Sequence, residues 1–507
     1  MKVLFHKLFN RLTITGLLII IQLLWIVNIF LFLAEQAVWI NVFFTVLSVL
    51  IVIYIINKDE NSAYKLGWIL LICLIPLLGG LFYIFFGNKR PSKKLRLRLE
   101  KTENEHKGLL LQQDDVLDGV NPRMAATTKY ITTHGAYPSY KNTGVKYYPL
   151  GEKMFKDMLV DLENADHYIF MEYFIIAESK MWDAMFDVLK RKASEGVDVR
   201  IMYDDVGSIF VLPKQLILNL KKAGIKCIPF NPFVPLVSLV MNNRDHRKIL
   251  VIDGKVGYSG GINIADEYIN LYPKYGHWKD TGLRLEGEAV WNFTVMFLNI
   301  WNAFLKTDVD YEQFRPHTWH KEGFGSDGVV QPYSDSPLDD EALGENIYID
   351  ILSQAKKYVY IFTPYLIIDN ELQTALTLAA KRGVDVRIVT PGTPDKKIVY
   401  KLTRSYYPPL IKAGVKIYEY TPGFIHAKSY VCDDEIAVVG TINMDYRSLY
   451  LHFECGTLLL NCAAIKDIKN DCIETFDKSN LINDNVLKSN FFTKLFDALL
   501  RVLSPLL

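Results

Sequence analysis

The sequence His246-Arg-Lys-Ile-Leu-Val-Ile-Asp253 returns in outline as His426-Ala-Lys-Ser-Tyr-Val-Cys-Asp433. Each segment has the composition of a β-strand, in which residues two apart share one face. The histidine and the lysine of each copy are therefore expected to point the same way. The aspartate falls on the other face or at the end of the strand, and Asp253-Gly254 is a strong hairpin signal. We predict that Asp253 orients other groups and does not attack the substrate.

The repeat extends to both sides of these segments and keeps the same order in both copies. Each copy alternates strand signals with amphipathic helix signals, which predicts an α/β domain. Two tandem copies predict two similar lobes related by a pseudo-twofold axis, with the active site between them. The paired segments are Tyr168–Ile176 with Tyr360–Ile368, Gly196–Ile201 with Gly383–Ile388, Lys222–Lys226 with Lys412–Lys416, and Gly260–Asn263 with Gly440–Asn443.

The sequence predicts five regions along the chain. A hydrophobic membrane region precedes the two lobes, and a stretch rich in polar residues, Gly and Pro separates them. The last segment has apolar residues at helical spacing, which predicts an amphipathic helix. The predicted bounds are 1–100 for the membrane region, 130–306 for the first lobe, 307–340 for the linker, 341–490 for the second lobe and 491–507 for the helix.

Three hydrophobic runs occupy the N-terminal region, at 13–33, 37–56 and 66–86. The first two are long enough to cross a hydrocarbon core of about 30 Å as helices. The third is interrupted by Pro76 and Gly79-Gly80, and it is compatible with a span, a re-entrant segment or an interfacial one. Basic clusters precede the first run and follow the third, and both should be cytoplasmic. This pattern favours two spans plus a third segment that does not cross, in a multi-pass protein of the cell membrane with cytoplasmic lobes.

Composition narrows the class of protein. The chain has 507 residues and a formal net charge of +1, so no overall basic field favours nucleic acid. The six cysteines form no C-x-x-C pair and no Cys/His cluster with zinc spacing. We therefore expect reduced thiols, no metal and no cofactor.

The paired motifs carry a resemblance to a known family. The pattern H-x-K-x-x-x-x-D followed by G-x-x-N, present twice, resembles the signature of the phospholipase D superfamily from about residue 140 to the C-terminus. The chain departs from that signature at Gly261 and Thr441, two positions that often hold serine in the family. The departure predicts that a hydroxyl hydrogen bond is missing in the first copy, and Ser259 is not expected to replace it.

The resemblance implies a two-step phosphoryl transfer. One imidazole attacks phosphorus, and the other protonates the departing alkoxide and later deprotonates the incoming alcohol. By resemblance His246 is the nucleophile and His426 the acid, although the pseudo-symmetry leaves this assignment open. The implied catalytic residues are His246, Lys248, Asp253, His426, Lys428 and Asp433; Asn263 and Asn443 would bind phosphate oxygens, and Asp280 and Glu454 would orient the imidazoles.

Within the superfamily, the chain is most similar to bacterial cardiolipin synthases. The segments that carry this similarity are Pro76–Gly80, Met171–Phe174, Asp204–Ser208, Asn242–Lys248 and Ser504–Leu507. The resemblance implies that two phosphatidylglycerol molecules are joined with release of glycerol, in contact with a lipid bilayer and without nucleic acid. A phospholipid hydrolase, another phosphatidyltransferase, a membrane-tethered nuclease and a non-enzymatic relative are the alternatives. The second substrate and the oligomeric state stay open.

Overall fold

The computed structural model describes residues 20, 21, 23–25, 27, 28, 31, 38–87, 93–232, 243–305, 310–320, 323–326, 328–339, 341–483 and 491–506. The chain divides into two compact units. The first comprises Met1–Arg90, Pro232–Asn242 and Ala498–Leu507, and the second comprises Pro91–Asn231 and Asn243–Asp497. The second unit therefore holds both predicted lobes, apart from Pro232–Asn242 of the first lobe.

Three helices of the first unit correspond to two of the predicted hydrophobic runs: α3 (Val38–Asn57), α4 (Ser62–Leu74) and α5 (Pro76–Phe86). Pro76 divides the third run into two helices. Proline has no N–H with which to continue the hydrogen bonding of α4, and it instead begins α5. Gly79 lets the two helices approach closely, since a Cβ there would lie 2.7 Å from the Cα of Ile72. The predicted run 13–33 lies largely outside the described residues.

The membrane prediction rests on sequence alone. Within the described ranges, the structure contains no helix that combines the length and the apolarity needed to cross a bilayer.

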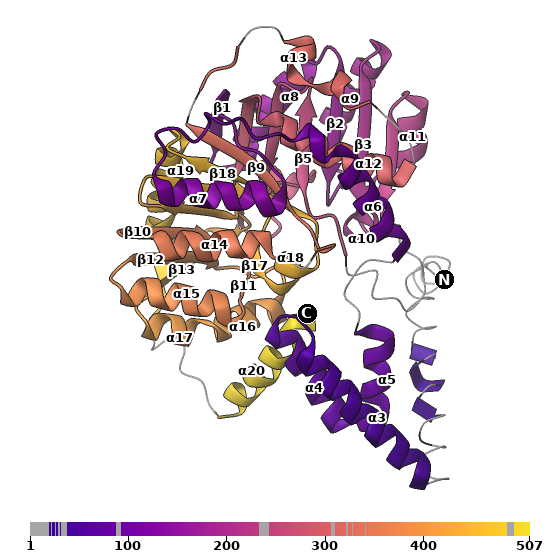
Figure 1. Cartoon of the computed structure of the whole chain (residues 1–507). Helices are drawn as coiled ribbons and strands as arrows, with labels where there is room; N and C mark the ends of the chain where they lie inside the picture. The colour runs from indigo at the N-terminus through magenta and orange to yellow at the C-terminus, as the bar shows by residue number, and fades with distance from the viewer. Residues whose placement is uncertain are drawn as a thin grey trace. The chain divides into compact units, whose positions relative to one another are not determined.

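The first lobe is built on a seven-stranded sheet in the order β1-β8-β6-β5-β2-β3-β4, of which β1, β2, β3 and β5 are labelled in Figure 1. Strands β2, β3 and β4 are parallel, and the other neighbouring pairs are antiparallel. Strand β2 is buried along its whole length, which accounts for its nearly continuous apolar sequence. The strands are β1 (Thr143–Tyr148), β2 (Tyr168–Tyr173), β3 (Asp198–Asp204), β4 (Lys226–Phe230), β5 (Lys248–Ile252), β6 (Val256–Gly260) and β8 (Gly282–Gly287).

The second lobe repeats this arrangement in an eight-stranded sheet, β19-β13-β12-β10-β15-β16-β18-β9. Its strands from β13 to β9 correspond one for one to those of the first sheet, and β19 is an addition at the edge. The two-lobed α/β prediction is therefore confirmed. The strands are β9 (Val329–Asp335), β10 (Tyr358–Phe362), β12 (Asp385–Pro391), β13 (Lys416–Tyr420), β15 (Ser429–Cys432), β16 (Ile436–Gly440), β18 (Glu454–Leu460) and β19 (Ser479–Leu481).

Helices cover both sheets. On the outer face of the first sheet, α8 (Gly151–Glu163), α9 (Lys180–Ser194) and α11 (Leu216–Lys222) enclose one apolar core. A second core is shared by both sheets with α12 (Val290–Leu305) and α19 (Ala464–Asp477), so these helices fix one lobe against the other. Helices α14 (Leu343–Gln354) and α15 (Asn370–Lys381) pack together over the second sheet (Figure 1).

The remaining described elements are short or lie outside the two sheets. Besides two short strands at the site, they include α6 (Lys93–His106), η1 (Lys107–Leu109), α7 (Pro122–Tyr130), η2 (Ile131–Gly135), α10 (Asp205–Ser208), η4 (Asp266–Ile269), η5 (Glu312–Phe314), α13 (Pro316–Trp319), β11 (Leu366–Ile367), α16 (Lys397–Ser405), α17 (Tyr407–Lys412), β17 (Met444–Asp445), α18 (Tyr446–Tyr450), α20 (Phe491–Leu503) and η7 (Ser504–Leu506).

Two predicted boundaries differ from the structure. The predicted linker 307–340 contains β9, which pairs with β18 over seven residues and forms the edge of the second sheet. The strand was missed because polar residues and Pro332 interrupt its apolar ones, and because its partner β18 lies far away in the sequence. The predicted membrane region 1–100 ends too late, since α6 belongs to the unit with the lobes and packs on α12.

Candidate active site

A short pairing between the lobes positions His246. Asp245 forms a parallel bridge with Phe453, and the N–H of His246 donates to the Phe453 carbonyl at 2.9 Å. One residue further along, Nδ1 of His246 lies 2.9 and 3.0 Å from the two carboxylate oxygens of Glu454. The histidine therefore precedes strand β5 instead of lying within it as predicted, because its backbone pairs with the other lobe.

His426 is held in the same way by the opposite pairing. Strand β14 (Gly423–Ile425) runs parallel to β7 (His277–Lys279), and the N–H of His426 donates to the Lys279 carbonyl at 2.7 Å. Nδ1 of His426 then lies 2.7 Å from Oδ2 of Asp280. Each lobe thus contributes one histidine and the carboxylate that orients the histidine of the other lobe.

The two motif lysines lie beside these imidazoles and are buried. Nζ of Lys428 is 2.9 Å from Nδ1 of His426, and Nζ of Lys248 donates to the carbonyl of His246 at 2.5 Å. Burial lowers the pKa of Lys248 to about 8 and that of Lys428 to about 7. Part of the positive charge of the site is therefore lost near neutral pH.

The surroundings of both imidazoles favour the neutral form in the absence of substrate. Burial, followed by the charges of Lys248 and Lys428, lowers the pKa of His246 well below its usual value. Burial, followed by the charge of Lys428, lowers the pKa of His426 to about 4, against the opposing effect of Asp280. A neutral imidazole that donates Nδ1–H to a carboxylate presents a lone pair on Nε2, which is the form needed for nucleophilic attack.

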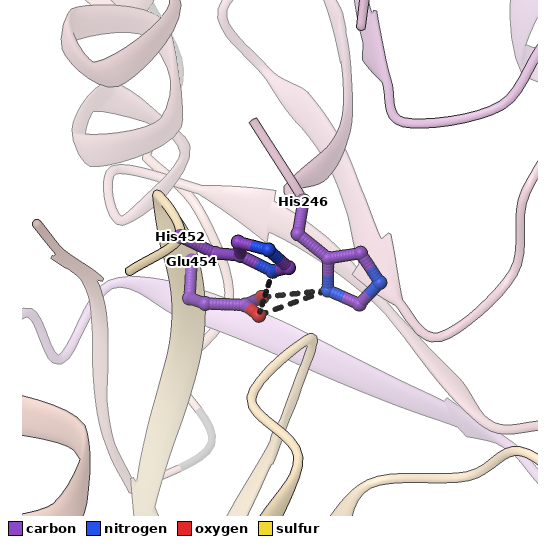
Figure 2. Close-up of side chains that lie close together, drawn as sticks. All are labelled: His246, His452 and Glu454. Carbon is purple, nitrogen blue, oxygen red and sulfur yellow. Dashed lines mark hydrogen bonds and ion pairs between the residues drawn. The ribbon is translucent and has the colours of Figure 1, made fainter. Parts of the chain in front are cut away.

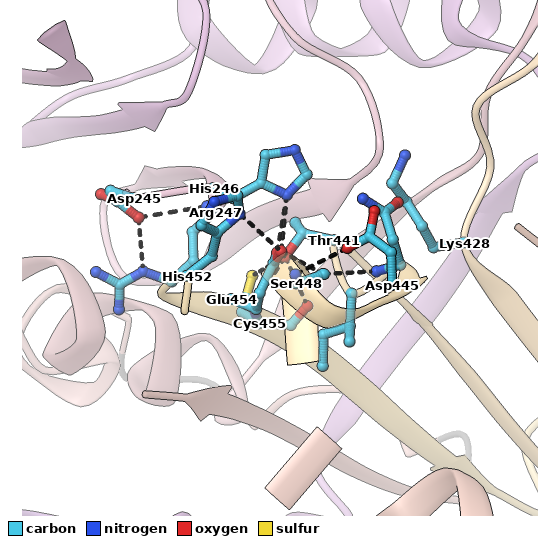
Figure 3. Close-up of polar contacts among 12 residues, drawn as sticks. Asp245, His246, Arg247, Lys428, Thr441, Asp445, Ser448, His452, Glu454 and Cys455 are labelled. Carbon is cyan, nitrogen blue, oxygen red and sulfur yellow. Dashed lines mark hydrogen bonds and ion pairs between the residues drawn. The ribbon is translucent and has the colours of Figure 1, made fainter. Parts of the chain in front are cut away.

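The two carboxylates have different surroundings, and Figure 3 shows those of Glu454. Glu454 accepts hydrogen bonds of 2.5 Å from the hydroxyls of Thr441 and Ser448. Asp280 accepts one from the N–H of Thr281 at 2.9 Å. Burial raises the pKa of Glu454. For Asp280, burial is outweighed by the interactions with His426, including its hydrogen bond, and by the charge of Lys428, so the pKa is lowered.

The substitution of glycine for a hydroxyl residue in the first copy has a steric reason. A Cβ on Gly261 would lie 2.0 Å from Oδ1 of Asp280, so no side chain fits there while Asp280 holds its position. The hydroxyl of Ser259 lies 3.4 Å from Sγ of Cys455, in a contact that does not involve Asp280. The hydroxyl contact that Thr441 makes in the second copy therefore has no counterpart from Gly261 or Ser259.

The two motif asparagines make contacts within the protein. Asn263 accepts from the N–H of Ile175 at 3.1 Å and donates to the hydroxyl of Tyr268 at 2.8 Å. Both ends of its amide are thus engaged in supporting the surrounding loops. The N–H of Asn443 donates to Oγ of Ser448 at 2.8 Å, next to Glu454.

The two motif aspartates lie at the far ends of their strands. Asp253 accepts three hydrogen bonds of 2.8 Å from the N–H groups of residues 166, 167 and 168, where β2 begins. Asp433 accepts three of 2.7–2.8 Å from residues 356, 357 and 358, where β10 begins. These hydrogen bonds join both aspartates to backbone at the start of a neighbouring strand, so their geometry is that of groups that hold this strand in place.

Sequence reasoning missed one residue of this site, His452. Its ring lies 5.6 Å from the ring of His246, and its Nδ1 lies 3.9 Å from Oε1 of Glu454 (Figure 2). In the first copy the same place, two residues before the carboxylate, is taken by Trp278, whose ring lies 5.5 Å from that of His426. The signal was present in the sequence as matching Trp-x-Asp and His-x-Glu triplets.

Comparisons with known proteins agree with this architecture. A family model described as "Cardiolipin synthase, PLD-like domain" matches residues 158–272 and 348–476, and one described as "Phospholipase_D-nuclease N-terminal" matches residues 46–88. The fold is similar to that of a phosphatidylserine synthase of Haemophilus influenzae, with a TM-score of 0.54 and 13% identity over 76% of this chain and 98% of the other.

Relatives match almost the whole length of the chain. An uncharacterized protein of Streptococcus mutans is 46% identical over 90% of this chain and 99% of its own. A cardiolipin synthase of Alkalihalophilus pseudofirmus is 35% identical over 92% of this chain and 93% of its own. Taken with the two lobes and the paired His-x-Lys segments, these matches show that the chain belongs to the cardiolipin synthase family of the phospholipase D superfamily.

Proposed function

We propose that this protein is a cardiolipin synthase that transfers the phosphatidyl group of one phosphatidylglycerol to the head-group hydroxyl of a second, releasing glycerol. The observation that carries the proposal is the pair of imidazole–carboxylate contacts, His246 with Glu454 and His426 with Asp280, flanked by two buried lysines. A nucleophile and an acid–base group of this kind are what a two-step transfer at phosphorus requires.

In the first step, Nε2 of His246 attacks phosphorus and forms a P–N bond while the P–O bond to glycerol breaks. Glu454 accepts the Nδ1–H of His246 and so stabilises the positive charge that develops on the ring. His426, protonated on Nε2, gives its proton to the departing glycerol oxygen. The anionic phosphate offsets the lysine charges that lower the pKa of His426, so substrate binding favours the protonated form of this histidine.

In the second step, the hydroxyl of the second phosphatidylglycerol attacks phosphorus and the P–N bond breaks. His426, now neutral, takes the proton from that hydroxyl, which restores both histidines to their starting forms. The ammonium groups of Lys248 and Lys428 stabilise the non-bridging oxygens in both steps. We propose that Asp253 and Asp433 act only by fixing β2 and β10.

The reaction is tested by product analysis. Purified protein in mixed micelles with labelled phosphatidylglycerol should give cardiolipin and glycerol in equal amounts. His246→Ala and His426→Ala should each abolish both products while the protein stays folded. Phosphatidic acid as the sole product would make the protein a hydrolase and refute the proposal.

The roles of the two histidines are tested with an activated substrate. A phosphatidyl ester of p-nitrophenol needs no proton to release its leaving group, so His426→Ala should still release nitrophenolate once per chain. The incoming alcohol lacks its base in this variant, so a phosphatidyl group should accumulate on His246 and be detectable by mass spectrometry after acid-free quenching. Accumulation on His426 in a His246→Ala variant would reverse the assignment.

We further propose, from the sequence, that runs 13–33 and 37–56 cross the cell membrane and that the segment broken at Pro76 does not. The exposed apolar side chains of α20, which include Phe492 and Leu499, support contact with a lipid surface. Cys73 in α4 is exposed, and the other described cysteines are partly or fully buried. Labelling of Cys73 by a membrane-impermeant maleimide only after the cells are opened would support a cytoplasmic location.

A further inference from the structure

The cluster of His246, His452 and Glu454 has an unexplained polar group. The side chain of His452 is only 12% exposed, and neither of its ring nitrogens has a hydrogen-bond partner among the described residues. An imidazole buried without partners is costly, and such a group usually marks a bound water, an ion or a role in chemistry.

We propose that these three side chains form a binding site for a divalent transition-metal ion of the zinc class, and that occupation of this site inhibits the enzyme. The ligand atoms all lie within 4.8 Å of one another. Nδ1 of His246 and Nδ1 of His452 lie 2.9 and 3.9 Å from Oε1 of Glu454. Ligand atoms around a tetrahedral zinc ion are about 3.3 Å apart, so small side-chain adjustments suffice.

The ligand set and its surroundings match the chemistry of zinc. Two imidazoles and one carboxylate, with a fourth position left for water, are a known zinc-binding combination. Glu454 is further held by hydroxyl hydrogen bonds from Thr441 and Ser448, the kind of outer contact that orients a ligating carboxylate (Figure 3). The nearby ammonium group of Lys248 opposes a cation, so we expect reversible binding weaker than that of a structural zinc site.

Inhibition follows from the tautomer that the metal requires. A metal on Nδ1 of His246 uses the lone pair of that nitrogen, so the single proton of the neutral ring moves to Nε2. Nε2 then has no lone pair with which to attack phosphorus. The metal also occupies Glu454, so the carboxylate no longer stabilises a developing imidazolium.

The first lobe provides an internal comparison. Trp278 occupies beside His426 the place that His452 occupies beside His246, at nearly the same ring separation and with similar interplanar angles of 44° and 42°. An indole offers no ligand, so the pair of His426 and Asp280 lacks a third donor at this position. The metal site therefore belongs to the pair of His246 and Glu454 alone. Replacing His452 by an aromatic residue should make the surroundings of this pair resemble those of His426 and Asp280.

The experiment measures metal binding directly, with protein freed of metal by a chelator and held in lipid-free detergent. Cobalt(II) is titrated while its visible absorption is recorded, because this reports coordination number and stoichiometry whether or not the chain makes cardiolipin. Wild type should bind one more ion per chain than His452→Phe. His317→Gln, which removes an exposed histidine lying 2.9 Å from Glu288, is the matched control and should keep the wild-type stoichiometry.

The inhibitory effect rests on the proposed function and is measured separately. Zinc should inhibit the wild type reversibly, and the half-inhibitory concentration should rise by about tenfold or more in His452→Phe, relative to the metal-free rate of each protein. His452→Gln, which retains a polar side chain, should behave like the phenylalanine variant. Equal cobalt stoichiometry and equal zinc sensitivity in wild type and both folded variants would overturn the proposal. If His452→Phe loses the cobalt site but the wild type makes no cardiolipin, only the proposed reaction is refuted and the metal site stands.

Discussion

Gly261→Ala, which adds a single methyl group, should lower turnover more than Thr441→Ala, which removes a hydrogen bond at the matching position of the second copy. An alanine Cβ would lie within 3.0 Å of three atoms of the Asp280 carboxylate, the nearest at 2.0 Å. The carboxylate must retreat by about 1 Å, since carbon–oxygen contacts below about 3 Å are repulsive. The φ angle of Gly261 is not positive, so an alanine there adds no backbone strain to this effect.

The displacement lengthens the contact of 2.7 Å between Asp280 and Nδ1 of His426 beyond hydrogen-bonding range. A misplacement of this size costs about a hundredfold in turnover, equal to about 2.7 kcal/mol of activation free energy. Thr441→Ala removes one of two hydroxyl contacts to Glu454 without any clash, and it should cost about tenfold. The assay is the initial rate of cardiolipin formation, with thermal melting to verify that each variant is folded.

A double-mutant cycle makes the reasoning refutable. If alanine at position 261 acts only by displacing Asp280, it should have no further effect in a chain that already carries Asp280→Ala. The double variant should therefore have the same rate as Asp280→Ala alone. A Gly261→Ala protein with near wild-type turnover, or an additive loss in the double variant, would show that the close contact does not hold the carboxylate in place.

Three other predictions follow from the geometry of the site. Glu454→Gln keeps the shape of the side chain but loses its charge, so turnover should fall by about 10²- to 10⁴-fold without loss of folding, as measured by product formation and circular dichroism. The pKa is about 7 for Lys428 and about 8 for Lys248, so both side chains lose their positive charge as the pH rises through this range. Inhibition by sulfate should therefore weaken by up to about tenfold per pH unit, and Lys428→Arg, which stays charged, should reduce that dependence. Asp253→Ala removes the acceptor of three backbone N–H groups. Urea unfolding should show that the free energy of unfolding falls by about 2–4 kcal/mol, with little change in the turnover of the folded fraction. A fall in turnover without loss of stability would contradict a purely structural role.

The sequence was informative wherever the signal was local or repeated. The echo of Tyr168–Ile176 in Tyr360–Ile368 predicted two lobes, and the two sheets indeed share the same strand order. The spacing of His426 and Lys428 predicted two side chains on one side, and their nitrogens are 2.9 Å apart. Alternation along a strand and repetition along a chain depend only on neighbouring residues, so both can be recognised without a structure.

Contacts between distant segments could not be predicted in the same way. The family resemblance indicated that Glu454 orients an imidazole, but nothing in the residues around it indicates that its partner is a histidine 208 residues earlier in the chain. That contact depends on a bridge between Asp245 and Phe453, which forms only when the lobes are packed together. The edge strand β9 was missed for a related reason, since its partner β18 is far away in the sequence.

The exchange of carboxylates between lobes makes the packing of the lobes part of the catalytic apparatus. Each histidine meets its carboxylate one residue beyond a short parallel pairing, at Ile425 with Lys279 and at Asp245 with Phe453. A slip of one residue in either pairing would turn the side chains to the other side and break that imidazole–carboxylate contact. The apolar core that α12 and α19 share with both sheets prevents such a slip. Neither lobe has a complete dyad of its own, so the interface between the lobes, and not either repeat, is the unit on which the proposed chemistry depends.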